Sequence, residues 1–120
     1  MRIAIPVQNN TKDTKVSTSF GRSPYFLIFD IKENVTQYIV NTAKDAQGGA
    51  GIKASQIIID NKADVVITPQ CGNNAYEVLK EAGIEVLESK GDIVEKNIIY
   101  YQNQKLNSLT DVHAGFHGAK

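Results

Sequence analysis

The sequence contains a single cysteine, Cys71, and this scarcity excludes an internal disulfide framework. A chain without disulfides fits a reducing compartment, so a cytoplasmic location is expected. One cysteine also cannot assemble a four-thiolate cluster site or a C-x-x-C redox pair within one chain. A pre-formed cluster held by one or two protein ligands is still compatible with this composition.

The chain also lacks an excess of charge of either sign and any long apolar run. Lys and Arg total 13 and Asp and Glu total 13, so no basic field indicates nucleic acid and no acidic field indicates a sink for cations. No apolar segment approaches the length that spans a membrane, and the start, Met1–Val7, is far too short for a signal peptide. At 120 residues, one domain with a real core is expected, without a nucleic-acid or membrane partner.

Apolar runs and helical spacings predict alternating strands and helices. Strands are expected at residues 2–5, 25–31, 35–40, 65–67 and 84–87, and helices at 50–60, 74–82 and 92–101. The first strand is expected to end at Pro6, near a sheet edge or a strand exit. The second and third strands should form an antiparallel hairpin, and helical crossovers should join the last two.

This element order predicts an α/β fold, a three-layer α/β/α domain on a mixed sheet of about five strands. Capping boxes are expected at Asn74 with Glu77 and at Asp92 with Glu95, and Gly83 should end its helix in a left-handed conformation. The domain is expected to span residues 1–102. Residues 103–120 contain few side chains of the buried type and are expected to form a flexible tail that contains Gly and His.

The loop that holds Cys71 is the first candidate site. It lies between the carboxyl end of a strand and the start of a helix, which is where ligands bind in open α/β sheets. Backbone N–H groups and the positive end of the helix dipole are expected to favour the thiolate, which suits a soft-metal ligand or a reactive thiol. The alternative is a small buried residue without special chemistry.

The glycine run at 48–51 and the two histidines are further candidates, and each has a structural alternative. Backbone N–H groups at the glycines could surround an anion, or the glycines could simply allow a tight loop and close helix packing. Neither the dinucleotide fingerprint nor the P-loop pattern is present. His113 and His117 could belong to a loop that folds over a ligand, or to an unstructured tail.

Residues for catalysis are sparse. Asp30, Asp64 and Asp92 are explained as strand-end, helix-end and cap residues, not as the clustered carboxylates of a two-metal nuclease. A Cys–His hydrolase would need a third group to orient the histidine, and none is evident. We therefore expect a protein that is not an enzyme.

Four motifs stand in order along residues 1–101. They are Arg2–Val7 (RIAIPV), Phe20–Phe26 (FGRSPYF), Gly49–Ile52 (GAGI) followed by Ala54, and a helix that starts as Gly72-x-x-Ala75 and runs to Ala82-Gly83-Ile84. Together they resemble the dinitrogenase iron–molybdenum cofactor biosynthesis family, which includes NifX, the C-terminal part of NifB and small stand-alone archaeal and bacterial relatives. In the turn before the second helix this chain has Gln70-Cys71, where many relatives have small residues or Gly-Ile.

The resemblance implies a ribonuclease-H-like fold without nuclease activity, and non-covalent binding or carriage of a metal–sulfur cluster. The implied cargo is an iron–molybdenum cofactor precursor or a related iron–sulfur or molybdenum cluster. Cluster donor and acceptor proteins would then be the partners. Tails that contain His and Gly, as in residues 113–118, are also similar to those of the family.

The leading hypothesis is a non-catalytic cluster carrier whose ligand lies across the N-termini of the first two helices. Backbone N–H groups would neutralise the negative charge, an arginine would add a hydrogen bond, and a thiolate and an imidazole would bind metal. The cofactor-binding residues expected are Arg22, Gly49, Gly51, Cys71, Gly72 and Asn73, and the metal ligands expected are Cys71, His113 and His117. The alternatives are a binding module for a non-metal anion, such as a nucleotide or phosphorylated metabolite, and a protein-interaction scaffold. The oligomeric state stays open.

Overall fold

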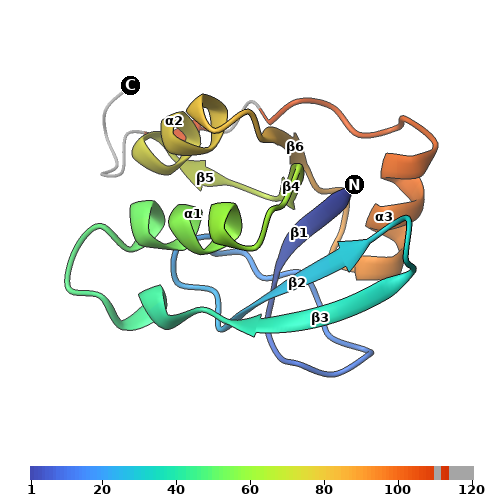
Figure 1. The fold of residues 1–120 in the computed structure, drawn as a ribbon, viewed down its shortest axis with the longest axis horizontal. Coiled ribbons are helices and arrows are strands. Elements are labelled where there is room, and N and C mark those ends of the chain that lie inside the picture. The colour runs from blue at the N-terminus through green and yellow to red at the C-terminus, as the bar shows by residue number, and fades with distance from the viewer. Residues whose placement is uncertain (110–111, 114–120) are drawn as a thin grey trace.

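The computed structural model describes residues 1–109 and 112–113, and its centre is a mixed five-stranded sheet (Figure 1). The strands lie in the order β3-β2-β1-β4-β6, and they are β1 (Arg2–Val7), β2 (Tyr25–Asp30), β3 (Val35–Val40), β4 (Val65–Thr68) and β6 (Glu85–Glu88). β2 pairs antiparallel with both β1 and β3, whereas β4 pairs parallel with both β1 and β6. The predicted fold class, including the antiparallel hairpin, is confirmed.

Helices cover both faces of this sheet, because successive side chains of a strand point to opposite faces. On β1, Ala4 packs in one core with side chains of α1 (Ala50–Asp60) and α2 (Asn73–Glu81). Its neighbours Ile3 and Ile5 pack in a second core with α3 (Val94–Gln102). Burying one such aliphatic side chain contributes roughly 1.5–3 kcal/mol, so the two cores together hold the three layers in place.

Pro6 lies inside β1, which is the central strand and ends at Val7, so the predicted end at Pro6 near a sheet edge is wrong, whereas the alternative, a position near a strand exit, agrees with the structure. β1 pairs with β4 only at Ile3 and Ala4, and it has therefore separated from β4 before Pro6. On its other side Pro6 is opposite Phe26, and its carbonyl accepts a hydrogen bond from the Ser17 N–H at 2.8 Å. A proline is tolerated in a central strand where no neighbouring strand needs its missing N–H.

Neither predicted capping box forms, because tertiary pairing sets both helix starts. α2 begins at Asn73 with Gly72 as its N-cap, directly after the two-residue strand β5 (Cys71–Gly72). α3 begins at Val94, because Ile93 forms a bridge with Lys15 that keeps the preceding backbone extended. No side chain caps either helix. Gly83, with φ of +80°, follows α2 in the left-handed conformation that was predicted.

The chain continues to pack after α3, so the ordered fold extends past the predicted boundary at residue 102. The Asn107 carbonyl accepts a hydrogen bond from the Glu88 N–H at 2.9 Å, and Leu109 is buried in the core beneath α1 and α2. Further along, strand β7 (Val112–His113) pairs parallel with β5. Within the described residues, no helix has both the length and the apolar character needed to cross a bilayer.

Candidate functional site

The N-termini of α1 and α2, which lie side by side in Figure 1, open onto one groove with a volume of about 360 Å³. Three segments that are far apart in the sequence form its walls: the loop before β2, the start of α1 and the start of α2. The lining residues are Ser19, Gly21, Arg22, Gly49, Ala50, Gly51, Ile52, Gly72, Asn74 and Ala75. The structure therefore brings together Arg22, Gly49, Gly51 and Gly72 of the predicted site, whereas Asn74 rather than the predicted Asn73 lines the groove.

The electrostatics of this groove favour a negative charge. Among the described residues that line it, Arg22 is the one charged side chain. Neither α1 nor α2 has an acidic residue in its first turn, and no side chain caps either of them. The first turn of a helix carries N–H groups without intrahelical acceptors, and the helix dipole adds positive potential there. The groove thus offers N–H groups that lack intrahelical acceptors, and a cation without an opposing carboxylate among the described lining residues.

Close backbone packing, which the glycines permit, brings the three walls together. A Cβ atom added to Gly21 would lie 2.9 Å from the Gly51 backbone nitrogen, and one added to Gly51 would lie 3.2 Å from the Ala75 Cβ. Gly49, the N-cap of α1, has φ of +66°, a conformation that side chains other than glycine rarely adopt. Close packing of glycines was the structural alternative to an anion cradle. The two explanations are compatible, since this packing is what places both helix starts on one groove.

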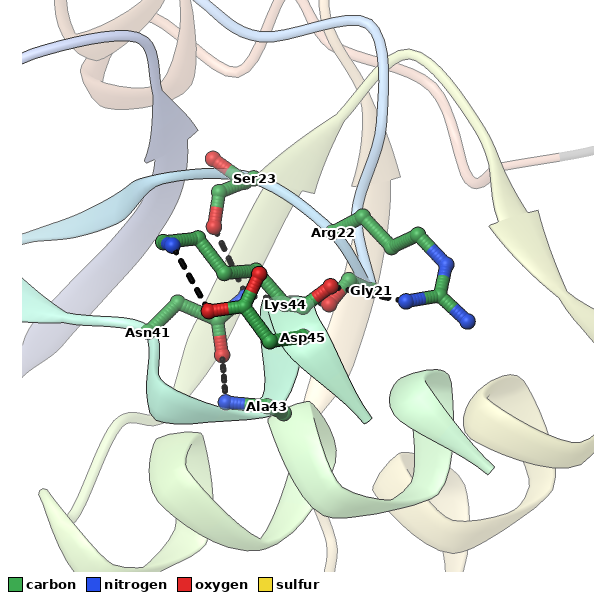
Figure 2. Close-up of polar contacts among 7 residues, drawn as sticks. All are labelled: Gly21, Arg22, Ser23, Asn41, Ala43, Lys44 and Asp45. Carbon is green, nitrogen blue, oxygen red and sulfur yellow. Dashed lines mark hydrogen bonds and ion pairs between the residues drawn. The ribbon is translucent and has the colours of Figure 1, made fainter. Parts of the chain in front are cut away.

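Arg22 is held at the groove by the short 3₁₀ helix η1 (Thr42–Asp45). Its Nη1 donates to the Lys44 carbonyl at 2.7 Å (Figure 2). Its backbone N–H donates to Ser19 Oγ at 3.1 Å. The Lys44 side chain instead pairs with Asp45 at 3.0 Å. A guanidinium carries five N–H donors, so an arginine anchored through one of them can still bind an anion.

Cys71 does not line the groove, and the predicted thiolate-favouring environment is wrong. Its side chain is 0% exposed and packs in the core with Phe20 and Ala75. Burial raises the pKa of the Cys71 thiol to about 12, because removal from water disfavours the charged thiolate. The role of Cys71 as a metal ligand stays a prediction.

The backbone of β7 lies next to the groove at one point. In the parallel pairing of β5 and β7, His113 is opposite Gly72, which is both the N-cap of α2 and a lining residue. His117 lies outside the described residues, and a ligand role for either histidine stays a prediction. Within the part of the chain that the structure describes, no three His, Cys, Asp or Glu residues are grouped so that they could hold a metal ion.

Six groove residues were not predicted as site residues, and two of them, Ser19 and Gly21, lie in the loop before β2. The sequence feature that could have indicated them is the apolar Phe20 next to Gly21 and Arg22 in an otherwise polar loop. Phe20 is 3% exposed and packs against Phe26 with ring centroids 5.4 Å apart, which anchors the loop to the sheet. An apolar anchor inside a loop fixes its neighbours in space, and here those neighbours form one wall of the groove.

A larger hollow of about 950 Å³ lies between α3 and the β2–β3 hairpin. Its lining mixes apolar side chains such as Phe29 and Ile98 with charges of both signs, including Lys15 and Glu95. The N-terminus of α3 lines this hollow, but Glu95 in the first turn of that helix opposes the positive end of its dipole, and no single sign of charge dominates the lining. The smaller groove is therefore the better candidate site, because its polar groups converge.

The strand order and the two helical layers place this chain in the class of ribonuclease-H-like α/β domains. Within that class, it belongs to the dinitrogenase iron–molybdenum cofactor family, whose model matches residues 1–104. The apo form of the orange protein from Desulfovibrio gigas superposes with a TM-score of 0.86 at 27% identity, over 92% of this chain and 93% of that one. A candidate NifB protein from Thermotoga superposes with a TM-score of 0.80 at 31% identity, over 99% and 98% of the two chains. The uncharacterized protein MJ0580 of Methanocaldococcus jannaschii is 29% identical over 91% of this chain and 92% of its own length.

Proposed function

We propose that this protein is a non-catalytic carrier of an anionic metal–sulfur cluster, either a precursor of the iron–molybdenum cofactor or a related iron or molybdenum cluster. Membership of the dinitrogenase iron–molybdenum cofactor family supports the link to that cofactor. The observation that carries the proposal is the groove itself, in which two helix starts without side-chain caps and Arg22 converge. The cluster is cargo that donor and acceptor proteins supply and remove.

In this proposal, hydrogen bonds and charge hold the cargo. Backbone N–H groups near Gly49–Gly51 and Gly72–Asn74 donate to sulfur or oxygen atoms of the cluster, and Arg22 adds a charge-assisted hydrogen bond. Among the described lining residues there is no thiol, imidazole or carboxylate, which supports binding without a metal–protein bond. A thiolate from Cys71 or an imidazole from the C-terminal segment would be an additional ligand, and Cys71 would first have to leave the core.

The lining residues also support a role without catalysis. Ser19 is the one hydroxyl among them, and no described lining residue is a histidine, lysine or carboxylate that could act as its general base. Charge stabilisation by Arg22 and the helix starts would serve a bound anion, but the described lining residues include no acid–base pair for proton transfer.

The test is anaerobic reconstitution with iron, sulfide and tetrathiomolybdate, followed by desalting, metal analysis and visible spectroscopy. We expect a retained chromophore with a stoichiometric metal content that falls in Arg22→Gln. A protein that leaves the column colourless and free of metal would refute the carrier proposal. Retention unaffected by Arg22→Gln but lost in Cys71→Ala would show that the thiol, not the groove, holds the cluster.

The second candidate function, binding of a non-metal anion in the same groove, rests on the same absence of metal-ligating side chains among the described lining residues. It predicts saturable binding of a nucleotide or phosphorylated metabolite that competes with tetrathiomolybdate. Isothermal titration calorimetry with phosphate, ATP and tetrathiomolybdate separates the two functions, since the carrier should prefer the sulfur-containing anion.

A further inference from the structure

We infer that Asn41 is a positioning residue that fixes the Arg22 guanidinium at the groove, an inference that rests on the proposed function for its effect on binding. Asn41 follows β3 in a polar stretch and does not line the groove. It is nevertheless 0% exposed, which is unusual for an asparagine. A buried amide is retained only where its donors and acceptor are satisfied, so the partners of Asn41 show what it holds.

The side-chain amide of Asn41 holds the backbone on both sides of Arg22. Its Nδ2 donates to the Gly21 carbonyl at 3.0 Å and to the Ser23 carbonyl at 2.8 Å (Figure 2). These two residues flank Arg22 in the chain. The amide therefore fixes the point from which the Arg22 side chain starts.

The same side chain also sets the acceptor that receives the guanidinium. Asn41 is the N-cap of η1, because its side-chain Oδ1 accepts from the Ala43 N–H at 3.1 Å. The backbone carbonyl of Asn41 accepts from the Lys44 N–H at 3.2 Å. η1 in turn presents the Lys44 carbonyl to Arg22 Nη1 at 2.7 Å. One buried amide thus defines both the origin and the anchor of Arg22, as Figure 2 shows.

This arrangement reduces the conformational freedom that Arg22 would otherwise lose on binding an anion. A flexible arginine loses rotamer entropy when a ligand orders it, whereas an anchored one has lost much of it already. Replacing Asn41 by Ala removes both donors and the cap, and leaves the Gly21 and Ser23 carbonyls without this partner. Arg22 should then become mobile, and the affinity for an anion should fall even though Asn41 does not contact the ligand.

Asn97 is a matched control in the same chain. It is also 0% exposed, its Nδ2 donates to the Gly91 and Ile93 carbonyls, and its Oδ1 accepts from the Lys90 N–H. It lies on α3, which packs on the opposite face of the sheet from α1 and α2. Asn97→Ala therefore removes the same set of hydrogen bonds from a buried amide without touching the groove.

The first arm of the test needs no ligand. The chain has two arginines, Arg2 and Arg22, so two Nε–Hε signals are expected in ¹⁵N NMR, and Arg2 is an internal reference. In the wild-type protein the heteronuclear NOE of Arg22 Nε should indicate an ordered side chain. It should fall in Asn41→Ala and stay unchanged in Asn97→Ala, while Arg2 stays unchanged in both.

The second arm measures affinity for tetrathiomolybdate by isothermal titration calorimetry in a double-mutant cycle. Arg22→Gln should weaken binding about tenfold, as expected for one charge-assisted hydrogen bond. Asn41→Ala should weaken it by at most that factor in the wild-type background, and by less than about twofold when Arg22 is already Gln. Asn97→Ala should leave the affinity for tetrathiomolybdate within about twofold of wild type, although it should lower the free energy of unfolding about as much as Asn41→Ala does.

The two arms separate this inference from the proposed function. If the wild-type protein binds no tetrathiomolybdate but Arg22 still loses order only in Asn41→Ala, the carrier proposal fails and the positioning role stands. The positioning role is refuted if Arg22 is as mobile in the wild type as in Asn41→Ala, or if Asn97→Ala loosens Arg22 equally. It is also refuted if Asn41→Ala weakens binding equally with and without Arg22. If Asn41→Ala does not fold, Asn41→Ser keeps the cap but not both donors, and it enters the same two arms.

Discussion

Substitution of Gly21 by alanine tests the close packing that forms the groove. A Cβ at this position would lie 2.9 Å from the Gly51 backbone nitrogen and 3.0 Å from its Cα, distances that require one segment to move. Both atoms belong to the backbone of α1, which cannot rotate away as a side chain can. Overpacking of this kind typically costs about 1–3 kcal/mol, which for a domain of this size corresponds to a decrease in melting temperature of roughly 4–12 °C.

Two glycines in the same region are graded controls. A Cβ added at Gly48 meets no atom of the described residues within 4 Å, and the Gly48 backbone is not left-handed. Gly48→Ala should therefore be neutral or stabilise the protein by about 0.4–1 kcal/mol, because it reduces the freedom of the unfolded chain. The destabilisation by Gly51→Ala should fall between those of the other two variants, because the added Cβ meets, among the described residues, only the Ala75 Cβ at 3.2 Å. The further change Ala75→Gly should remove that contact in the double variant.

The free energy of unfolding from urea titrations, together with tetrathiomolybdate affinity, is the assay. We expect Gly21→Ala to lower both, since moving the loop also moves Arg22, whereas Gly48→Ala should leave affinity unchanged. If the free energy of unfolding of Gly21→Ala stays within about 0.5 kcal/mol of the wild-type value, the loop can accommodate a Cβ atom at this position. The explanation of the groove by close glycine packing would then be refuted. Equal destabilisation by Gly48→Ala would refute it as well.

Three further predictions follow from individual side chains. The pKa of the Cys71 thiol is raised from 9.0 to about 12, so the folded state binds this proton more tightly, and this contribution to stability is complete below about pH 9 and is lost as pH rises toward 12. Tyr101, whose pKa is raised chiefly by burial, adds to the loss of stability at high pH. Urea titrations should show that Cys71→Ala reduces the dependence of stability on pH in this range, and a dependence that Cys71→Ala leaves unchanged contradicts the assignment. Arg22→Gln should change the free energy of unfolding by less than about 0.5 kcal/mol, since the side chain is exposed, while added salt should weaken tetrathiomolybdate binding more in the wild type than in the variant. Leu109→Ala should destabilise the protein by about 2–4 kcal/mol in thermal and urea unfolding, because Leu109 is buried; no effect would restore the domain boundary at residue 102.

The periodic segments were predictable from the sequence because their patterns report burial directly. The apolar run of β2 and the helical spacing of α1 both predict elements that the structure contains within about one residue. Their packing then follows, since the alternating faces of β1 and β4 leave helices no other surface to cover. The convergence of Arg22, Gly49, Gly51 and Gly72 on one groove was likewise predictable, because the starts of the first two helices were expected to lie together.

The errors share a different cause, which is dependence on contacts between distant segments. The start of α3 depends on the bridge between Lys15 and Ile93, and no local signal near Asp92 reveals it. The orientation of Cys71 depends on β5, which has two residues. So short a strand shows no alternation of apolar and polar residues from which the buried side could be predicted. Asn41 lies in a stretch of polar residues that is typical of an exposed loop, and only the folded chain shows its amide enclosed between two segments.

The burial of Cys71 also has a consequence for delivery. A carrier must release its cargo intact, and each bond formed to a metal delays that release. A thiol that stays protonated and enclosed by the core can neither replace a sulfide of a bound cluster nor be oxidised readily by species in the groove. In the proposed carrier, the most reactive atom of the chain is thus kept out of the exchange chemistry, and the lifetime of the complex is determined by hydrogen bonds that an acceptor protein can displace one after another.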